Sequence, residues 1–295
     1  MKLLERFQGC LIGLAVGDAI GTALEFQPRG SFTPIADMIG GGPFNLIPGQ
    51  WTDDTSMALC LATSLATRSC FDPIDQMNRY CNWYQYGYLS STGSCFDIGN
   101  TTRMALEKYL STGDPYSGPT DSNAAGNGSI MRLAPVPMFY FPDIENAIYF
   151  SIESSKTTHG AEECLACCSI LSQVICSALS GESKEFITHF ESPIMTEGIK
   201  ILTSRNWIHK LEREISGSGY VVESLEAALW CFWTTNCYSD CILRAANLGD
   251  DADTTAAIAG QIAGAFYGIK NIPENWIRKL YMKEEILNLA ERLMS

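Results

Sequence analysis

Residues 9–21, GCLIGLAVGDAIG, place a glycine at every fourth position of an otherwise apolar stretch. In a helix this spacing puts all four glycines on one face, where each costs roughly 1 kcal/mol relative to alanine. Residues 256–268, AAIAGQIAGAFYG, repeat the device with Gly260, Gly264 and Gly268 among alanines. Close approach of two helices would compensate for the glycines. We therefore expect these two helices to pack tightly near the centre of the protein.

Helical periodicity dominates the rest of the chain, and strand-like alternation is scarce. The best strand candidate is residues 135–141, which Pro135, Pro137 and Pro142 weaken. The loops concentrate at 27–52 and 112–128, and neither resembles a linker between domains. The sequence thus predicts an all-α protein with one domain, residues 1–295. The predicted helices lie near residues 3–20, 54–68, 73–88, 100–111, 143–154, 161–180, 221–235, 238–247, 254–268 and 283–294.

Composition restricts the partners and the compartment. The net charge of −13, with no run of Lys or Arg, argues against nucleic acid as a partner. Twelve cysteines lie mostly among apolar helical positions, which is typical of buried free thiols in a reducing compartment. Cys164 and Cys167 have CxxC spacing, but there is no second such pair for a four-cysteine zinc site, so we expect them to pack in the core. The amino-terminal apolar run lacks a convincing cleavage site, and no segment reaches roughly 20 apolar residues. We expect a cytoplasmic protein without an integral membrane segment.

Two acidic clusters stand at predicted helix starts. Residues 51–55 read WTDDT, and residues 249–255 read GDDADTT. A helix start needs one capping residue, whereas each cluster supplies several carboxylates and hydroxyls that repel unless a cation lies between them. Oxygen ligands of this kind suit Mg²⁺ or Mn²⁺. One such cluster is compatible with capping; two of them favour a metal site.

Three weaker features accompany these clusters. Glu25, after Gly17-Asp18-Ala19-Ile20-Gly21, has the chemistry of a general base or bridging ligand, as does any exposed glutamate. Residues 126–129, GNGS, offer backbone N–H groups that could cradle a phosphate, although an ordinary turn has the same composition. His159 lies among hydroxyl residues at a helix junction, where a structural histidine is the commoner case.

Taken together, these motifs resemble the ADP-ribosylglycohydrolase family, and most closely its branch that removes ADP-ribose from arginine in dinitrogenase reductase. The matching segments follow the family's order: residues 17–21 with Glu25, 51–55, 96–100, 126–132, 158–159 and 249–254. Each motif alone is loose, but all six in sequence are specific.

The resemblance implies an orthogonal helical bundle with a two-metal active-site cleft. It assigns catalytic roles to Glu25, Asp97, Asp53 and Asp253, with Asp97 facing the substrate guanidinium and favouring arginine-linked substrates. The expected metal ligands are Thr52, Asp53, Asp54, Asp251, Asp253 and Thr254, and the expected substrate-binding residues are Asn100, Gly126, Asn127, Gly128, Ser129 and His159. The implied partner is an ADP-ribosylated protein, with dinitrogenase reductase as one candidate.

Other functions stay open at this point. A relative acting on serine-linked or O-acetyl-ADP-ribose would share most of these motifs, and a non-catalytic ADP-ribose-binding relative would share the cleft. A metal-dependent phosphohydrolase is disfavoured because the chain has no His-Asp pair. A helical scaffold is disfavoured by the density of unpaired carboxylates. The choice between Mg²⁺ and Mn²⁺ and the oligomeric state are not set by the sequence.

Overall fold

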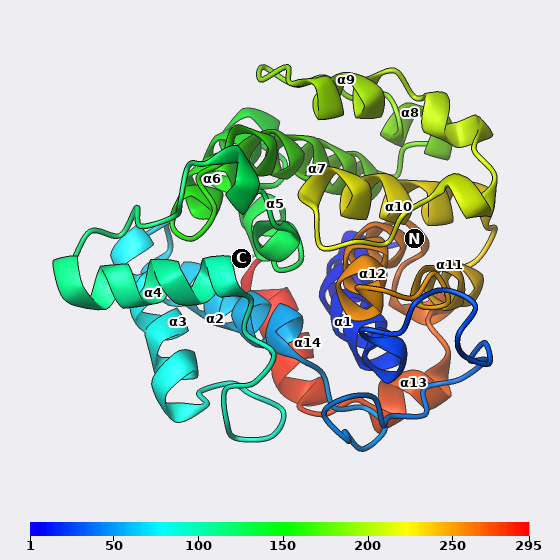
Figure 1. Ribbon diagram of the computed structural model, residues 1–295, viewed down its shortest axis with the longest axis horizontal. Coiled ribbons are helices and arrows are strands. Elements are labelled where there is room, and N and C mark those ends of the chain that lie inside the picture. Colours follow the sequence, from blue (N-terminus) through cyan, green and yellow to red (C-terminus); the bar gives the residue numbers. More distant parts are fainter. Residues whose placement is uncertain (295) are drawn as a thin grey trace.

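The two glycine-rich segments form the central helix pair of the protein. In the computed structural model, which describes residues 1–294, they are α1 (Leu3–Gly21) and α12 (Ala252–Tyr267), which lie side by side at the core (Figure 1). The pair is antiparallel: a Cβ on Gly13 would lie 2.4 Å from the carbonyl oxygen of Gly260, and one on Gly264 only 2.0 Å from that of Gly9. Such distances leave no room for a side chain. The predicted close packing is confirmed, except that Gly268 ends α12 with a φ of 74° instead of packing within it.

Fourteen α-helices occur in the described residues, which contain no β-strand and only two isolated bridges, Gly41 to Leu46 and Gly126 to Tyr220. This confirms the all-α class. The helices other than α1 and α12 are α2 (Asp53–Arg68), α3 (Pro73–Tyr86), α4 (Asn100–Thr112), α5 (Pro135–Tyr140), α6 (Ile144–Lys156), α7 (Glu162–Ser180), α8 (Lys184–Ile187), α9 (Glu197–Thr203), α10 (Val221–Thr234), α11 (Tyr238–Ala246), α13 (Glu274–Lys279) and α14 (Lys283–Arg292).

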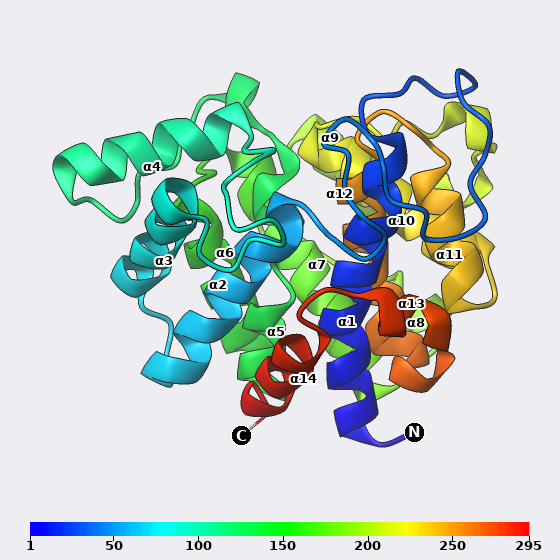
Figure 2. The same cartoon turned by 90° about the horizontal axis from the view of Figure 1, so that it is seen from below.

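The central pair is covered on several sides. Helices α7, α10 and α11 pack against α12, while α14 and α2 contact α1. Helices α2 to α6 gather on the side of the molecule opposite α11 and α13 (Figures 1 and 2). The amino-terminal end of α12 reaches the end of α1 at Gly21, because α12 runs antiparallel to α1. The start of α2 meets the same end of α1, where Thr52 N–H donates to Asp18. This arrangement brings the two acidic clusters together.

One strand candidate proves to be helical, and one expectation needs correction. Residues 135–141 do not form a strand; Pro135–Tyr140 is the short helix α5, and proline at its first position supplies a helical φ without the loss of a needed N–H donor. Two helical segments, Leu3–Leu24 and Glu162–Ser180, are also long and apolar enough to cross a membrane, contrary to the expectation that none is. They are 94% and 72% buried inside the protein, as core helices are.

All twelve cysteines are free thiols. Nine of them, Cys70, Cys95 and Cys237 excepted, are buried, and Cys164 and Cys167 pack within α7 with no exposed surface. The expectation of core packing is confirmed.

Candidate active site

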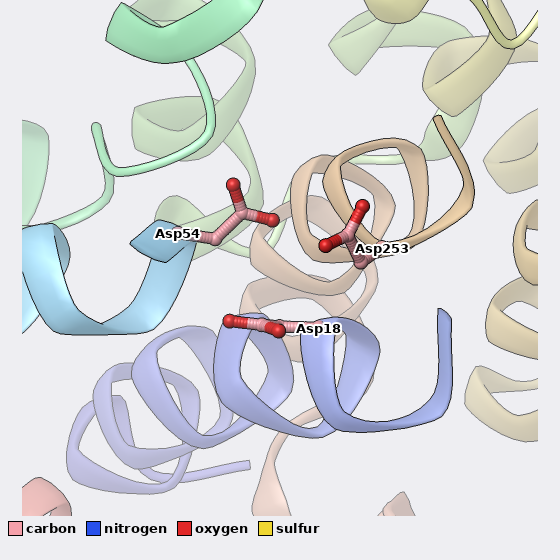
Figure 3. Close-up of side chains that lie close together, drawn as sticks. All are labelled: Asp18, Asp54 and Asp253. Carbon is pink, nitrogen blue, oxygen red and sulfur yellow. The ribbon is translucent and has the colours of Figure 1, made fainter. Parts of the chain in front are cut away.

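The acidic side chains from positions 54 and 253 meet, although about two hundred residues separate them in the chain. Figure 3 shows the carboxylates of Asp18, Asp54 and Asp253 pointing toward one another from α1, α2 and α12. One oxygen from each of these carboxylates lies within 4.8 Å of the other two, and all three residues are buried. The hydroxyl of Thr52 lies 3.2 Å from Asp253 Oδ2. The two predicted clusters therefore form one site.

The residues that precede α2 and α12 do not cap these helices with their side chains. Thr52, at the start of α2, and Asp251, at the start of α12, make no side-chain capping hydrogen bond. Instead Asp18 accepts from the backbone N–H groups of Thr52 and Thr55, at 2.8 and 3.0 Å, and from both of their hydroxyls. Because α1 supplies the cap for α2, the carboxylates of Asp53 and Asp54 stay available for another partner.

A second group of ligand atoms lies beside the first. Glu25, Asp251 and Asp253 also place oxygens within 4.8 Å of one another, so Asp253 belongs to both groups. Two backbone hydrogen bonds of 2.8 Å hold the relevant loops together: Phe26 N–H donates to the Asp250 carbonyl, and Asp250 N–H donates to the Gln27 carbonyl. This pairing fixes Glu25 next to the start of α12.

The electrostatics of the site call for a cation. Burial, followed by the charge of Asp253, raises the pKa of Asp18 and of Asp251 to about 7. The same causes raise the pKa values of Glu25, Asp53 and Asp54 far above their ordinary range. No lysine or arginine forms an ion pair with any of them in residues 1–294.

Two of the buried ligand atoms have no hydrogen-bond partner. Asp54 Oδ2 and Glu25 Oε2 are enclosed by protein without a donor. A buried acceptor left without a partner is costly, and a divalent cation bound at each group would satisfy these atoms and offset the mutual repulsion. The residues present therefore fit divalent cations, and the oxygen-only donor set suits hard ions.

A cleft of about 780 Å³ opens above these ligands. Of the predicted site residues, ten line it: Glu25, Asp53, Asp97, Asn100, Gly126, Asn127, Gly128, His159, Asp251 and Thr254. Thr52, Asp54 and Asp253 are buried and do not line the cleft. They can serve as cation ligands from beneath its floor. Ser129 is 2% exposed and also lies outside the lining.

The turn at 126–129 forms one wall of the cleft. It contains the 3₁₀ turn Asn127–Ser129 and is anchored by Asn127 N–H, which donates to the Gly219 carbonyl at 3.1 Å. The Asn127 side chain donates to Asp251 Oδ2 at 2.7 Å and to the Ser224 hydroxyl at 2.8 Å. Asn127 thus orients Asp251, an acidic residue of the site. The sequence predicted only contact with phosphate for this turn.

His159 lies at the back of the same wall. Arg132 donates to the Thr158 hydroxyl at 2.6 Å, which leaves that hydroxyl to donate to His159 Nδ1 at 2.8 Å. We assign Nδ1 as the acceptor of this hydrogen bond, which places the imidazole proton on Nε2, beside the Gly126–Gly128 segment. Burial, reinforced by the charge of Arg132, lowers the pKa of His159 to about 3, so the ring is a neutral donor.

Asp97 lines the cleft from the segment before α4. Its backbone has a φ of 61°, which is unusual for a residue other than glycine and marks a strained conformation. Burial and then the charge of Asp53 raise its pKa to about 11. Asn100, at the start of α4, lines the cleft and accepts from Arg103 at 2.9 Å.

Several site residues were missed by the sequence reasoning. Asp18 was read as part of a glycine-rich helix end, although a charged residue in an otherwise apolar and glycine-lined helix was a usable signal. Ser218 and Gly219 line the cleft from a loop that carries no recognisable motif. Their position depends on the bridge between Gly126 and Tyr220, which no local pattern reveals.

The fold and the site define an all-helical protein whose cleft gathers carboxylates and hydroxyls in an arrangement fit for divalent cations. The family model of ADP-ribosylglycohydrolase matches residues 1–295, and the chain belongs to that family.

Individual relatives agree with this membership. The chain is 47% identical to ADP-ribosylarginine hydrolase Tri1 of Serratia proteamaculans, over 98% of this chain and 79% of the relative. It is 30% identical to ADP-ribosyl-[dinitrogen reductase] glycohydrolase of Rhodospirillum rubrum, over 95% and 92% of the two chains. A solved structure titled ADP-ribosylglycohydrolase-related protein complex superposes with a TM-score of 0.88 at 40% identity, covering 99% of this chain and 98% of the other.

Proposed function

We propose that this protein hydrolyses the N-glycosidic bond between ADP-ribose and an arginine side chain of a modified protein, with the help of divalent cations. The observation that carries the proposal is the double group of carboxylates that shares Asp253 at the floor of the cleft. The relatives named above as an ADP-ribosylarginine hydrolase and an ADP-ribosyl-[dinitrogen reductase] glycohydrolase support the reaction.

The cations would be held by residues from three helices and the loop after α1. Bound there, they would supply the Lewis acidity that orients a ribose diol and a water molecule. The donor set accepts Mg²⁺ and Mn²⁺ alike. The proposed ligands are Thr52, Asp53, Asp54, Asp251, Asp253 and Thr254, to which we add Asp18 and Glu25 because each belongs to one of the two groups of carboxylates.

The chain's own residues would position the substrate and move the protons. Glu25 lines the cleft beside these ligands, so an oxygen that does not bind a cation can accept a proton from the attacking water. Asp97 lines the cleft, and because burial and neighbouring carboxylates raise its pKa, its protonated form can donate to the departing guanidine nitrogen. The N–H group of Gly128 and Nε2–H of His159 would face the diphosphate and the nucleotide, while Gly126, whose own N–H donates to the Ala124 carbonyl at 2.8 Å, would contact them without donating.

The remaining partners follow from charge and thiol state. We propose that residues 1–295 form one domain, that the substrate is a protein and not a nucleic acid, and that dinitrogenase reductase is one substrate to test. The twelve free thiols support a cytoplasmic location, and the burial of both long apolar helices supports the absence of a membrane-spanning segment.

The deciding experiment compares linkages. Arginine-, serine- and carboxylate-linked ADP-ribosyl peptides, and ADP-ribosylated dinitrogenase reductase, are incubated with the protein in EDTA, in Mg²⁺ and in Mn²⁺, and free ADP-ribose is measured. We expect release from the arginine-linked substrates in the presence of either metal only. Release from serine-linked peptides alone would contradict the arginine assignment, and undiminished release in EDTA would contradict the role of the cations.

A further inference from the structure

Three phenylalanine rings lie in a row from the mouth of the cleft to the segment before α4. Phe26 directly follows Glu25, lines the cleft and is 65% exposed. The ring of Phe44 packs edge-on against Phe26 with centroids 6.4 Å apart, and its centroid lies 5.2 Å from that of Phe96. Phe96 directly precedes Asp97. We call Phe26, Phe44 and Phe96 the aromatic rim.

The backbone at both ends of the aromatic rim is strained. Phe26 has a φ of 60° and Asp97 a φ of 61°, in a region that bulky residues avoid. Asp250, whose carbonyl accepts from Phe26 N–H, has a φ of 57°. Such strain gathers at sites where a side chain must point in a set direction. Burial does not explain the direction of Phe26, because most of its side chain faces solvent.

The cleft beside the aromatic rim is acidic. Among the described residues, its lining contains no lysine or arginine. The histidine of the lining, His159, is neutral and adds no positive charge. A guanidinium suits such a surface, because its flat, delocalised charge stacks on aromatic faces and pairs with carboxylates. The acidic lining residues are Glu25, Asp53, Asp97, Asp250 and Asp251.

We propose that the aromatic rim, together with Asp97, is the binding site for the arginine side chain of the modified substrate, stacking on its guanidinium and its alkyl stem. This inference rests on the proposed function and adds the surface that distinguishes arginine from other linkages. A serine-linked substrate has no cation to stack on these rings. Selectivity for the amino acid is thereby located outside the part of the cleft that takes ADP-ribose.

Leucine substitutions test the aromatic rim, because leucine keeps apolar area but lacks a π face. Phe44→Leu is the cleanest change, since Phe44 is not adjacent in sequence to any site carboxylate. We expect kcat/KM for an arginine-linked peptide to fall about two- to fivefold, chiefly through KM, with the affinity for free ADP-ribose unchanged in calorimetry. Phe186→Leu is the matched control: Phe186 is 56% exposed and lies on α8.

An unchanged kcat/KM for Phe44→Leu, or an equal loss of ADP-ribose affinity, would overturn the assignment. A second measurement is independent of turnover. Agmatine, which carries the guanidinium and alkyl chain of arginine, is titrated into protein saturated with ADP-ribose and Mn²⁺. Binding that weakens in Phe44→Leu and not in Phe186→Leu supports the aromatic rim, and binding that is absent or equal in all three proteins contradicts it. Agmatine binding by a wild-type protein that does not cleave arginine-linked peptides would contradict the proposed reaction alone.

Discussion

At the scale of single residues, Asp253 has the central position because it belongs to both groups of carboxylates. Its Oδ1 accepts from Thr254 N–H at 2.8 Å, and its Oδ2 lies 3.2 Å from the Thr52 hydroxyl. No other residue of the two groups is shared between them. Neutralising Asp253 therefore weakens both groups at once.

We expect Asp253→Asn to lower kcat/KM for arginine-linked substrate by at least about 100-fold, because even residues that only orient metal ligands cost about 10- to 100-fold. Asp53→Asn should act in the same direction. Calorimetry should show weaker Mn²⁺ binding in both variants. Retention of wild-type turnover by both variants in EDTA would contradict the metal-dependent mechanism. Asp240→Asn, on α11 and outside the cleft lining, is the matched control.

The Thr158 hydroxyl lies between the buried guanidinium of Arg132 and the ring of His159. Thr158→Val removes the hydroxyl that accepts from Arg132 and donates to His159, leaving one guanidinium N–H buried without this acceptor. We expect the free energy of unfolding to fall by about 1–3 kcal/mol and ADP-ribose affinity to fall with it, because His159 loses its fixed tautomer. Thr158→Ser should restore both. A wild-type ADP-ribose affinity in Thr158→Val would show that the relay does not orient His159.

At the scale of elements, the contact between α1 and α12 positions the site. The glycines bring the two helix axes close enough for Asp18 and Asp253 to share one group of ligands, since a Cβ on Gly21 would lie 2.4 Å from the Asp253 Cα. Any widening of this contact separates the carboxylates.

We expect Gly13→Ala to lower the free energy of unfolding by about 3 kcal/mol or more, because the added Cβ would lie 2.4 Å from a backbone oxygen that cannot move aside. Gly99→Ala is the control: a Cβ there meets nothing within 4 Å and its φ is −62°. Chemical denaturation measures both. If Gly13→Leu or Gly264→Leu left stability unchanged, close packing of α1 on α12 would not stabilise the protein.

The long elements were predictable from the sequence, and the short ones were not. The glycine spacing and apolar periodicity predicted α1, α7 and α12 because such patterns repeat over several turns. Helices α8 and α9 have four and seven residues, too few for periodicity to emerge, and α5 was hidden by its prolines. Short helices are specified by capping and tertiary contacts more than by pattern.

At the scale of the whole molecule, the acidic site links stability to pH and to cations. For Asp18 and Asp251 the pKa rises from 3.8 to about 7 on folding, so the folded protein binds more protons than the unfolded chain between these values. Stability that these groups contribute below pH 4 is lost as the pH rises to about 7. The lowered pKa of His159 has the opposite effect on stability, which it increases as the pH rises from about 3 to 6.5. This is one group, and the several carboxyl groups outweigh it.

We therefore expect the Tm of the protein in EDTA to rise as the pH is lowered from 8 to about 5. Mn²⁺ should raise the Tm most at pH 8, where the carboxylates are ionised. At a free Mn²⁺ concentration of a hundred times Kd, the free energy of unfolding should increase by about 2.7 kcal/mol. Differential scanning fluorimetry across this pH range, with and without Mn²⁺, measures both effects. A Tm in EDTA that falls steadily from pH 8 to pH 5 would contradict the raised pKa values.

The sequence predicted which residues belong to the site better than it predicted what they do. The two acidic clusters were recognisable because each supplies more carboxylates than a helix start needs. That Asp18 caps α2, that Asn127 holds Asp251 and that Ser129 is buried outside the cleft lining depend on contacts between distant segments. Such contacts leave no periodic trace in the chain.

The most direct test of the account is an anomalous diffraction map of crystals grown with Mn²⁺. We predict two strong peaks, one among Asp18, Asp54 and Asp253 and one among Glu25, Asp251 and Asp253. A map with no peak between these side chains, with Mn²⁺ bound only at surface carboxylates, would contradict the account.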